Sequence, residues 1–123
     1  MNRLLPHPEP QALRVETVLH ALSDPVRLAI VAELVRAGCV LNCTETAARL
    51  ALTMPKSTCS QHYRILREAG VIACERKGVD LVSHVRVQDL EARFPGLLSA
   101  VLQAWARGGT AVLPSPPIAR SST

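Results

Sequence analysis

Apolar residues recur along this chain at spacings that predict helices first and a β-hairpin later. The segment from residue 11 to 22 has apolar residues at roughly helical intervals: Leu13, Val18, Leu19 and Leu22. A second helix is predicted over residues 25–38, because Asp24 can cap its start and Gly38 can end it. Pro25 suits the first helical position between them.

Two further helices are predicted in the middle of the chain. One begins near Asn42, which stands three residues before Glu45 in a capping-box pattern. The next follows a turn that contains Pro55, and its predicted inward face carries Cys59, Tyr63 and Leu66. Its opposite face collects polar side chains: Ser57, Ser60, Gln61 and Arg64.

After Gly70 the period of the pattern changes from helical to alternating. Residues 71–87 predict two short strands joined at residues 77–80, which is a β-hairpin wing. A short helix over residues 88–93 is stopped by Pro95-Gly96, and a last helix is predicted over residues 96–105. The apolar stripe of this last helix is too wide for a small domain's own core, and this width predicts a homodimer.

Both ends of the chain have the composition of tails. Prolines at positions 6, 8 and 10 predict a flexible N-terminal tail over residues 1–10, and Gly, Pro and Ser predict another over residues 108–123. Residues 11–107 are then one DNA-binding and dimerisation domain. No internal repeat is visible.

Composition narrows the classes of partner. The 123 residues carry a net charge of +4, which favours a polyanion. The only aromatic residues are Tyr63, Phe94 and Trp105, so stacking on single-stranded nucleic acid is disfavoured and duplex DNA is preferred. No apolar run is long enough for a membrane span, and the proline-rich start does not match a secretory signal, so a cytoplasmic protein is expected.

The polar face of the fourth predicted helix has the chemistry of a DNA-reading surface. Hydroxyl, amide and imidazole groups can bond base edges, while cationic side chains neutralise phosphates. The alternative for any one of these residues, Thr58 especially, is that it only caps a solvated helix. The candidate DNA-binding residues are Lys56, Ser57, Thr58, Ser60, Gln61, His62 and Arg64 on this helix, with Arg76 and Lys77 in the wing.

The chain resembles the ArsR/SmtB family of winged-helix repressors between about Leu13 and Trp105. The strongest element is the run STCSQHYRILREAG from Ser57 to Gly70, which follows LSDPVRLAIVAEL and precedes a basic hairpin. The resemblance implies a mainly α fold with a β-hairpin wing, and a dimer formed through the first and last helices. It also implies a repressor whose fourth helix enters the major groove of a palindromic operator, and which an inducer releases.

Two parts of the chain depart from the pattern of that family. The wing has Val79 and Asp80 where relatives often continue with basic or aromatic residues, so two solvated charges are the alternative to DNA contact for Arg76 and Lys77. The turn before the fourth helix is about two residues longer than usual, which puts the role of Lys56 in doubt.

The sensing motifs of the family are not kept. The cysteine-rich metal signature is replaced by Asn42-Cys43-Thr44-Glu45-Thr46, and no histidine follows His84, so no metal site is proposed. Cys39 and Cys43 remain a possible thiol sensor for a soft metal, a metalloid or an oxidant. Cys43 would be the first residue of its helix, where the dipole lowers a thiol pKa. The alternative is ordinary packing, which is also expected of Cys59 and Cys74.

Three classes of function follow from these observations. A dimeric DNA-binding repressor with an unknown inducer explains the polar helix face, the basic charge and the apolar last helix together. A winged-helix module that binds only protein would instead show apolar residues on the outward side of the fourth helix. An enzyme is disfavoured, because no catalytic sequence context and no glycine-rich phosphate loop is present.

Overall fold

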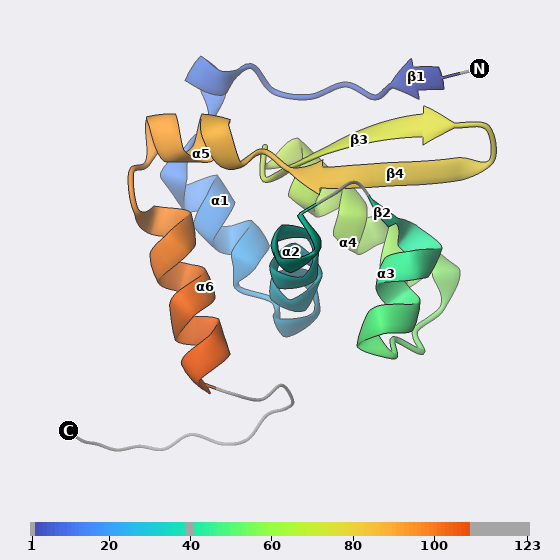
Figure 1. The fold of residues 1–123 in the computed structure, drawn as a ribbon. Helices are drawn as coiled ribbons and strands as arrows, with labels where there is room; N and C mark the ends of the chain where they lie inside the picture. Colours follow the sequence, from blue (N-terminus) through green and yellow to red (C-terminus); the bar gives the residue numbers. More distant parts are fainter. Residues whose placement is uncertain (1, 39–40, 109–123) are drawn as a thin grey trace.

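The computed structural model describes residues 2–38 and 41–108, and these form helices packed against a small antiparallel sheet (Figure 1). The helical elements are η1 (Pro10–Ala12), α1 (Val15–Leu22), α2 (Pro25–Ala37), α3 (Cys43–Leu50), α4 (Lys56–Glu68), α5 (Val87–Arg93) and α6 (Leu97–Gly108). The strands are β1 (Asn2–Leu4), β2 (Leu41–Asn42), β3 (Ile72–Lys77) and β4 (Asp80–Val85), in the sheet order β1-β3-β4-β2. The predicted winged helix-turn-helix fold is confirmed, with α3 and α4 as the helix-turn-helix and β3-β4 as the wing.

The junction of α1 and α2 is built as its sequence predicts. The carboxylate of Asp24 accepts hydrogen bonds from the backbone N–H groups of Val26 and Arg27, at 2.9 and 3.1 Å. These are two of the donors that the first turn of a helix leaves unpaired. At the other end of α2, Gly38 adopts a left-handed conformation with φ of 67° and ends the helix.

The first α-helix starts later than its apolar spacing predicts. Residues 10–12 form a 3₁₀ turn, Leu13 is extended, and α1 begins only at Val15. The extended backbone directs the Leu13 side chain into the core, where it is 1% exposed. Burial of a whole leucine side chain is worth about 2 kcal/mol, which outweighs one further turn of exposed helix.

The hydrophobic core lies where the helices meet the sheet. Its fully buried apolar side chains come from α1, α2, α4, β3 and the segments beside them: Leu13, Val18, Ile30, Val31, Leu66, Val71 and Ile72. Leu66 belongs to α4 and Ile72 opens β3, so the wing and the fourth helix share one core. The orientation of α4 is therefore fixed by the same packing that forms the domain.

The N-terminal segment, which the sequence predicts to be a tail over residues 1–10, lies against the wing. Strand β1 pairs with β3 in the register Asn2↔Lys77, Arg3↔Arg76 and Leu4↔Glu75. Beyond the strand, Nε2 of His7 accepts a hydrogen bond of 2.8 Å from the backbone N–H of Cys74. The prolines do not prevent this, because they fall after the paired strand, where no ladder hydrogen bond is needed.

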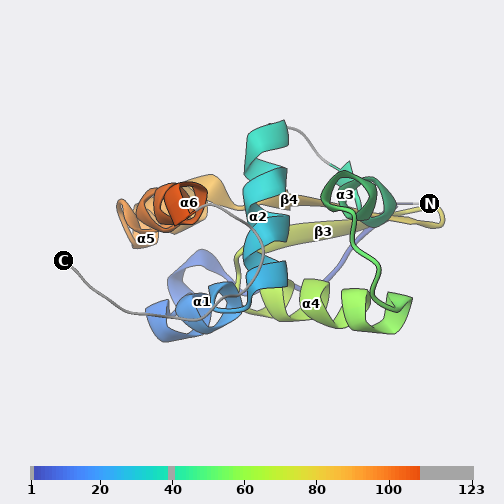
Figure 2. The same ribbon diagram turned by 90° about the horizontal axis from the view of Figure 1, so that it is seen from below.

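Helices α1 and α6 lie at the end of the domain opposite the wing tip (Figures 1 and 2). Val15 and Leu19 of α1 are 40% and 44% exposed. On α6, Val101, Leu102 and Trp105 are only half-buried. The last helix runs three residues beyond its predicted end, to Gly108. The C-terminal tail predicted from residue 108 otherwise lies outside the described residues.

Gly70 sits at a point where a side chain has no room. Its φ is 85°, and an added Cβ would overlap Cδ2 of the buried Leu13. Gly96 has a similar φ of 82° but open space around it. We expect Gly70→Ala to lower the free energy of unfolding by about 1–3 kcal/mol more than Gly96→Ala does, measured by urea denaturation. Equal losses in the two variants would show that backbone strain alone matters at Gly70.

Candidate nucleic-acid interface

Helix α3 is held in place at its start and on its side. Asn42 and Glu45 form the predicted capping box, with the Asn42 Oδ1 accepting from the Glu45 N–H at 2.7 Å and the Glu45 Oε1 accepting from the Asn42 N–H at 2.9 Å. The buried Glu33 of α2 accepts hydrogen bonds from Arg36 on its own helix and from Arg49 of α3. These cations lower the pKa of the Glu33 carboxyl. The ion pair between Arg49 and Glu33 joins α3 to α2.

Helix α4 presents one polar face to solvent. The exposed residues of this face are Lys56, Ser57, Thr58, Ser60, Gln61 and Arg64. On the opposite face, Tyr63 and Leu66 are buried, as predicted. Arg64 Nη2 donates to Gln61 Oε1 at 2.7 Å, so these two side chains are held together. The cluster therefore offers hydroxyl, amide and guanidinium groups along about two helical turns.

His62 does not belong to this exposed face, although the sequence grouped it with the DNA-reading residues. Its side chain is only 14% exposed. Its Nδ1 lies 3.3 Å from Arg27 Nη1 and 3.9 Å from a carboxylate oxygen of Asp24. His62 lies three residues before Ile65 and four before Leu66. Residues at these spacings share one side of a helix, so the His62 side chain faces α2. His62 therefore helps to position α4.

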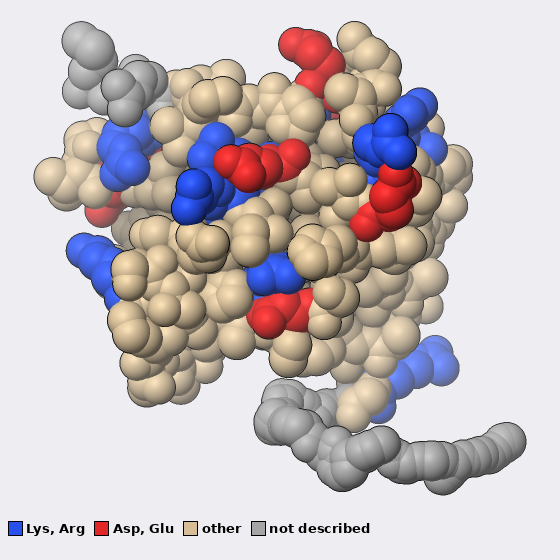
Figure 3. Space-filling view, turned by 180° about the vertical axis from the view of Figure 1, so that it is seen from behind, with Lys and Arg blue, Asp and Glu red and all other residues tan. Residues whose placement is uncertain are grey.

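The two predicted cations of the wing differ in their exposure to solvent. Lys77 is exposed near the tip, whereas Arg76 is half-buried on β3. Gly78 makes the turn with φ of 63°, and Val79 at the tip is 94% exposed. Seen from behind, the molecule shows separate Lys and Arg side chains with acidic ones among them rather than one continuous basic patch (Figure 3). The Lys and Arg side chains on this face are thus interspersed with acidic ones.

Arg67 is a residue of this region that the sequence did not single out. Its Nη1 donates to the carbonyl oxygen of Pro6 at 2.9 Å, which ties the N-terminal segment to the end of α4. A cation in the last turn of a helix was visible in the sequence. Its partner was not, because the contact spans 61 positions of the chain.

Of the three cysteines in the described residues, Cys74 is buried and Cys43 and Cys59 are half-buried, and the pKa of each thiol is raised. Cys43 is the first residue of α3, as predicted, but burial raises its pKa to about 11 instead of lowering it. Its Sγ donates to the Leu81 carbonyl at 3.7 Å. Burial also raises the pKa of Cys59 and of Cys74, and the Cys74 Sγ lies 3.4 Å from Ser83 Oγ. Desolvation of the thiolate outweighs the helix dipole here.

The proposed pair of Cys39 and Cys43 cannot be described as a pair, since Cys39 lies outside the described residues. Within residues 2–38 and 41–108, no group of three or more His, Cys, Asp and Glu side chains is placed to hold a metal ion.

No helix in the same ranges combines the length and the apolar character that crossing a membrane requires.

Comparison with known proteins gives a consistent set of relatives. Residues 22–75 match a family model described as a helix-turn-helix domain. The chain is 32% identical over 84 residues to the uncharacterized HTH-type transcriptional regulator YceK of Bacillus subtilis, an alignment that covers 68% of this chain and 82% of that protein.

Solved structures of transcriptional regulators share the fold. An ArsR family transcriptional regulator is 18% identical, with a TM-score of 0.56 over 84% of this chain and 91% of its own. The repressor BigR from Xylella fastidiosa is 26% identical, with a TM-score of 0.57 over 74% and 85% of the two chains. The repressor PagR of Bacillus anthracis is also 26% identical, with a TM-score of 0.53 over 74% and 94%.

The raised pKa of Cys43 predicts that its thiol is alkylated slowly near neutral pH. A shift from 9.0 to about 11 lowers the thiolate fraction near neutral pH about 100-fold relative to an unperturbed cysteine. We expect iodoacetamide to alkylate Cys43 in the folded protein about 100-fold more slowly than in the denatured chain at pH 7.5, and faster as pH rises. Site-resolved mass spectrometry measures both rates. A folded-state rate equal to the denatured rate would contradict this.

Proposed function

Because the chain belongs to the HTH-type transcriptional regulators and shares the fold of an ArsR family regulator, we propose that it is an ArsR-type repressor that binds a palindromic operator as a homodimer. The observation that carries the proposal is the exposed polar and cationic face of α4, which α2 supports from behind through the contact of Arg27 with His62. The protein is a DNA-binding regulator and not an enzyme, as the sequence predicted. We place it in the cytoplasm, because such a regulator must share a compartment with its DNA.

The residues of the exposed face divide into two roles in this proposal. Ser57, Thr58, Ser60 and Gln61 carry hydroxyl and amide groups that match base edges in the major groove. Lys56, Arg64, Arg76 and Lys77 contact phosphates or the minor groove. His62 is reassigned from base reading to the positioning of α4, since its ring faces Arg27 and Asp24.

The dimer of this proposal forms through α1 and α6. Both helices lie at one end of the domain and leave apolar side chains accessible there, among them Val15 and Leu19. Two copies related by a two-fold axis would bury these faces and place two α4 helices in successive major grooves, about 34 Å apart. A small-molecule inducer that changes the angle between the two copies would release the operator. The domain for both tasks is residues 11–107.

The dimer interface can be tested with a matched pair of charge insertions. We expect Leu19→Glu to convert the protein from dimer to monomer at micromolar concentration, because a carboxylate would be buried without a partner. Val79→Glu inserts the same charge at the wing tip and should leave the dimer intact. Sedimentation velocity measures the oligomeric state of both variants. A wild-type chain that stays monomeric would overturn the dimer, and loss of the dimer in both variants would overturn this interface.

The division of roles on α4 can be tested on promoter and unrelated duplexes. We expect Gln61→Ala to relax base preference, and Arg64→Ala to weaken binding to every sequence and to reduce the slope of log K against log salt by about one unit. Fluorescence anisotropy at several salt concentrations measures both effects. Because Arg64 donates to Gln61, the double variant shows how far the two losses are coupled. Identical effects of both single variants on unrelated DNA would contradict the division.

A further inference from the structure

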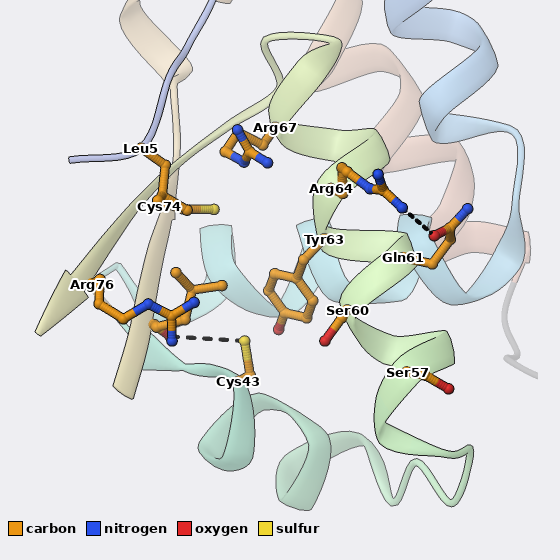
Figure 4. Close-up of a pocket in the computed structure, with 11 residues that line it drawn as sticks. Leu5, Cys43, Ser57, Ser60, Gln61, Tyr63, Arg64, Arg67, Cys74 and Arg76 are labelled. Carbon is orange, nitrogen blue, oxygen red and sulfur yellow. Dashed lines mark hydrogen bonds between the residues drawn. The ribbon is translucent and has the colours of Figure 1, made fainter. Parts of the chain in front are cut away.

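A cavity of about 590 Å³ lies between α4, β3, β4, the start of α3 and the N-terminal segment (Figure 4). Its less polar walls are formed by Leu5, Tyr63, Cys74 and Leu81. Cavities of this size accommodate small organic molecules, and the usual lining is apolar with a few convergent polar groups. The sequence did not predict this cavity, because five separate segments build it.

The polar lining of the cavity is cationic. Arg64 and Arg67 of α4 and Arg76 of β3 belong to its lining, with Arg64 turned toward Gln61 (Figure 4), while no lining residue is acidic. Within residues 2–38 and 41–108, none of these three arginines takes part in an ion pair. Each guanidinium has five N–H donors, so the single bonds from Arg64 to Gln61 and from Arg67 to Pro6 leave donors for a ligand.

We propose that this cavity binds a small organic anion. Its carboxylate, phosphate or sulfonate group would accept charge-assisted hydrogen bonds from the guanidinium groups, which match such planar or tetrahedral anions well. Its apolar body lies against Leu5, Leu81 and the ring of Tyr63. The phenol of Tyr63 stays protonated, because burial raises its pKa far above neutral pH, and it adds no competing negative charge.

The N-terminal segment completes the site. Leu5 reaches the cavity because β1 pairs with β3 and because Arg67 and Cys74 bond to residues Pro6 and His7. A winged-helix domain without this segment would leave the cavity open on that side.

The location of the cavity gives the anion a regulatory effect, and this step rests on the proposed function. Ser60, Gln61 and Arg64 line the cavity and also belong to the exposed face of α4 that is proposed to read DNA. An anion bound to Arg64 occupies donors that would otherwise face a phosphate, and it brings negative charge close to the duplex. The anion and the operator therefore compete.

The binding step is tested with 8-anilinonaphthalene-1-sulfonate, an aromatic sulfonate whose fluorescence rises in apolar surroundings. We expect saturable binding of one molecule per chain, weakened about tenfold by Arg64→Gln and by Arg67→Gln. Arg107→Gln, which removes the same charge from the exposed end of α6, should change the affinity less than about twofold. Circular dichroism confirms that each variant is folded. Absence of saturable binding, or equal affinity in all three variants, overturns the site.

Two further measurements distinguish an organic anion from inorganic phosphate, and ligand binding from release of DNA. Inorganic phosphate at equal concentration should displace the probe only weakly, and naphthalene-1-sulfonate should displace it well. Equal displacement by the two competitors would mean that the apolar walls contribute nothing, and would overturn an organic ligand. In anisotropy, the probe should release promoter duplex from the wild-type chain and much less from Arg67→Gln. Probe binding without release overturns the competition alone. A chain that binds the probe but no duplex overturns the proposed function instead, while the cavity stands.

Discussion

The buried guanidinium of Arg27 is the interaction on which the arrangement of the helices depends. Arg27 is 7% exposed, and its Nε donates to the carbonyl oxygen of Ala21 at 2.7 Å while its Nη2 donates to that of His20 at 3.3 Å. Those carbonyls belong to the last turn of α1, where a cation is electrostatically favoured. Its Nη1 faces His62 of α4. One side chain of α2 thus touches the end of α1 and the middle of α4.

The contacts of Arg27 matter for function because they join α1 and α4, which have different roles in the proposed repressor. Helix α1 belongs to the proposed dimer interface, and α4 carries the proposed DNA-reading face. A cation buried among these acceptors cannot lose one of them without leaving a costly unpaired charge. The Asp24 carboxylate, which caps α2 beside His62, reinforces the same junction. The spacing of two α4 helices in a dimer would therefore follow any change in how α1 packs.

The local features of the fold could be predicted from the sequence. Asp24, Gly38 and the pair Asn42 and Glu45 act within their own helices, so neighbouring residues determine them. The wing and the inward face of α4 follow from periodicity in the same way. The features that were missed depend on distant residues: the pairing of the N-terminal segment with β3, the inward orientation of His62, and the burial that makes Cys43 a weak acid. The cavity was missed for the same reason.

The pairing of β1 with β3 also covers a strand edge at which two copies of the chain could otherwise pair. Strand β3 would otherwise be an edge strand, with backbone donors and acceptors open along the side of the wing. An open edge recruits strands from other chains, and the wing lies close to the place where copies of a DNA-binding protein crowd together along a duplex. By occupying this edge with three residues of its own, the chain covers the outer part of β3 with a short strand, and the proposed dimer through α1 and α6 would use the opposite end of the domain.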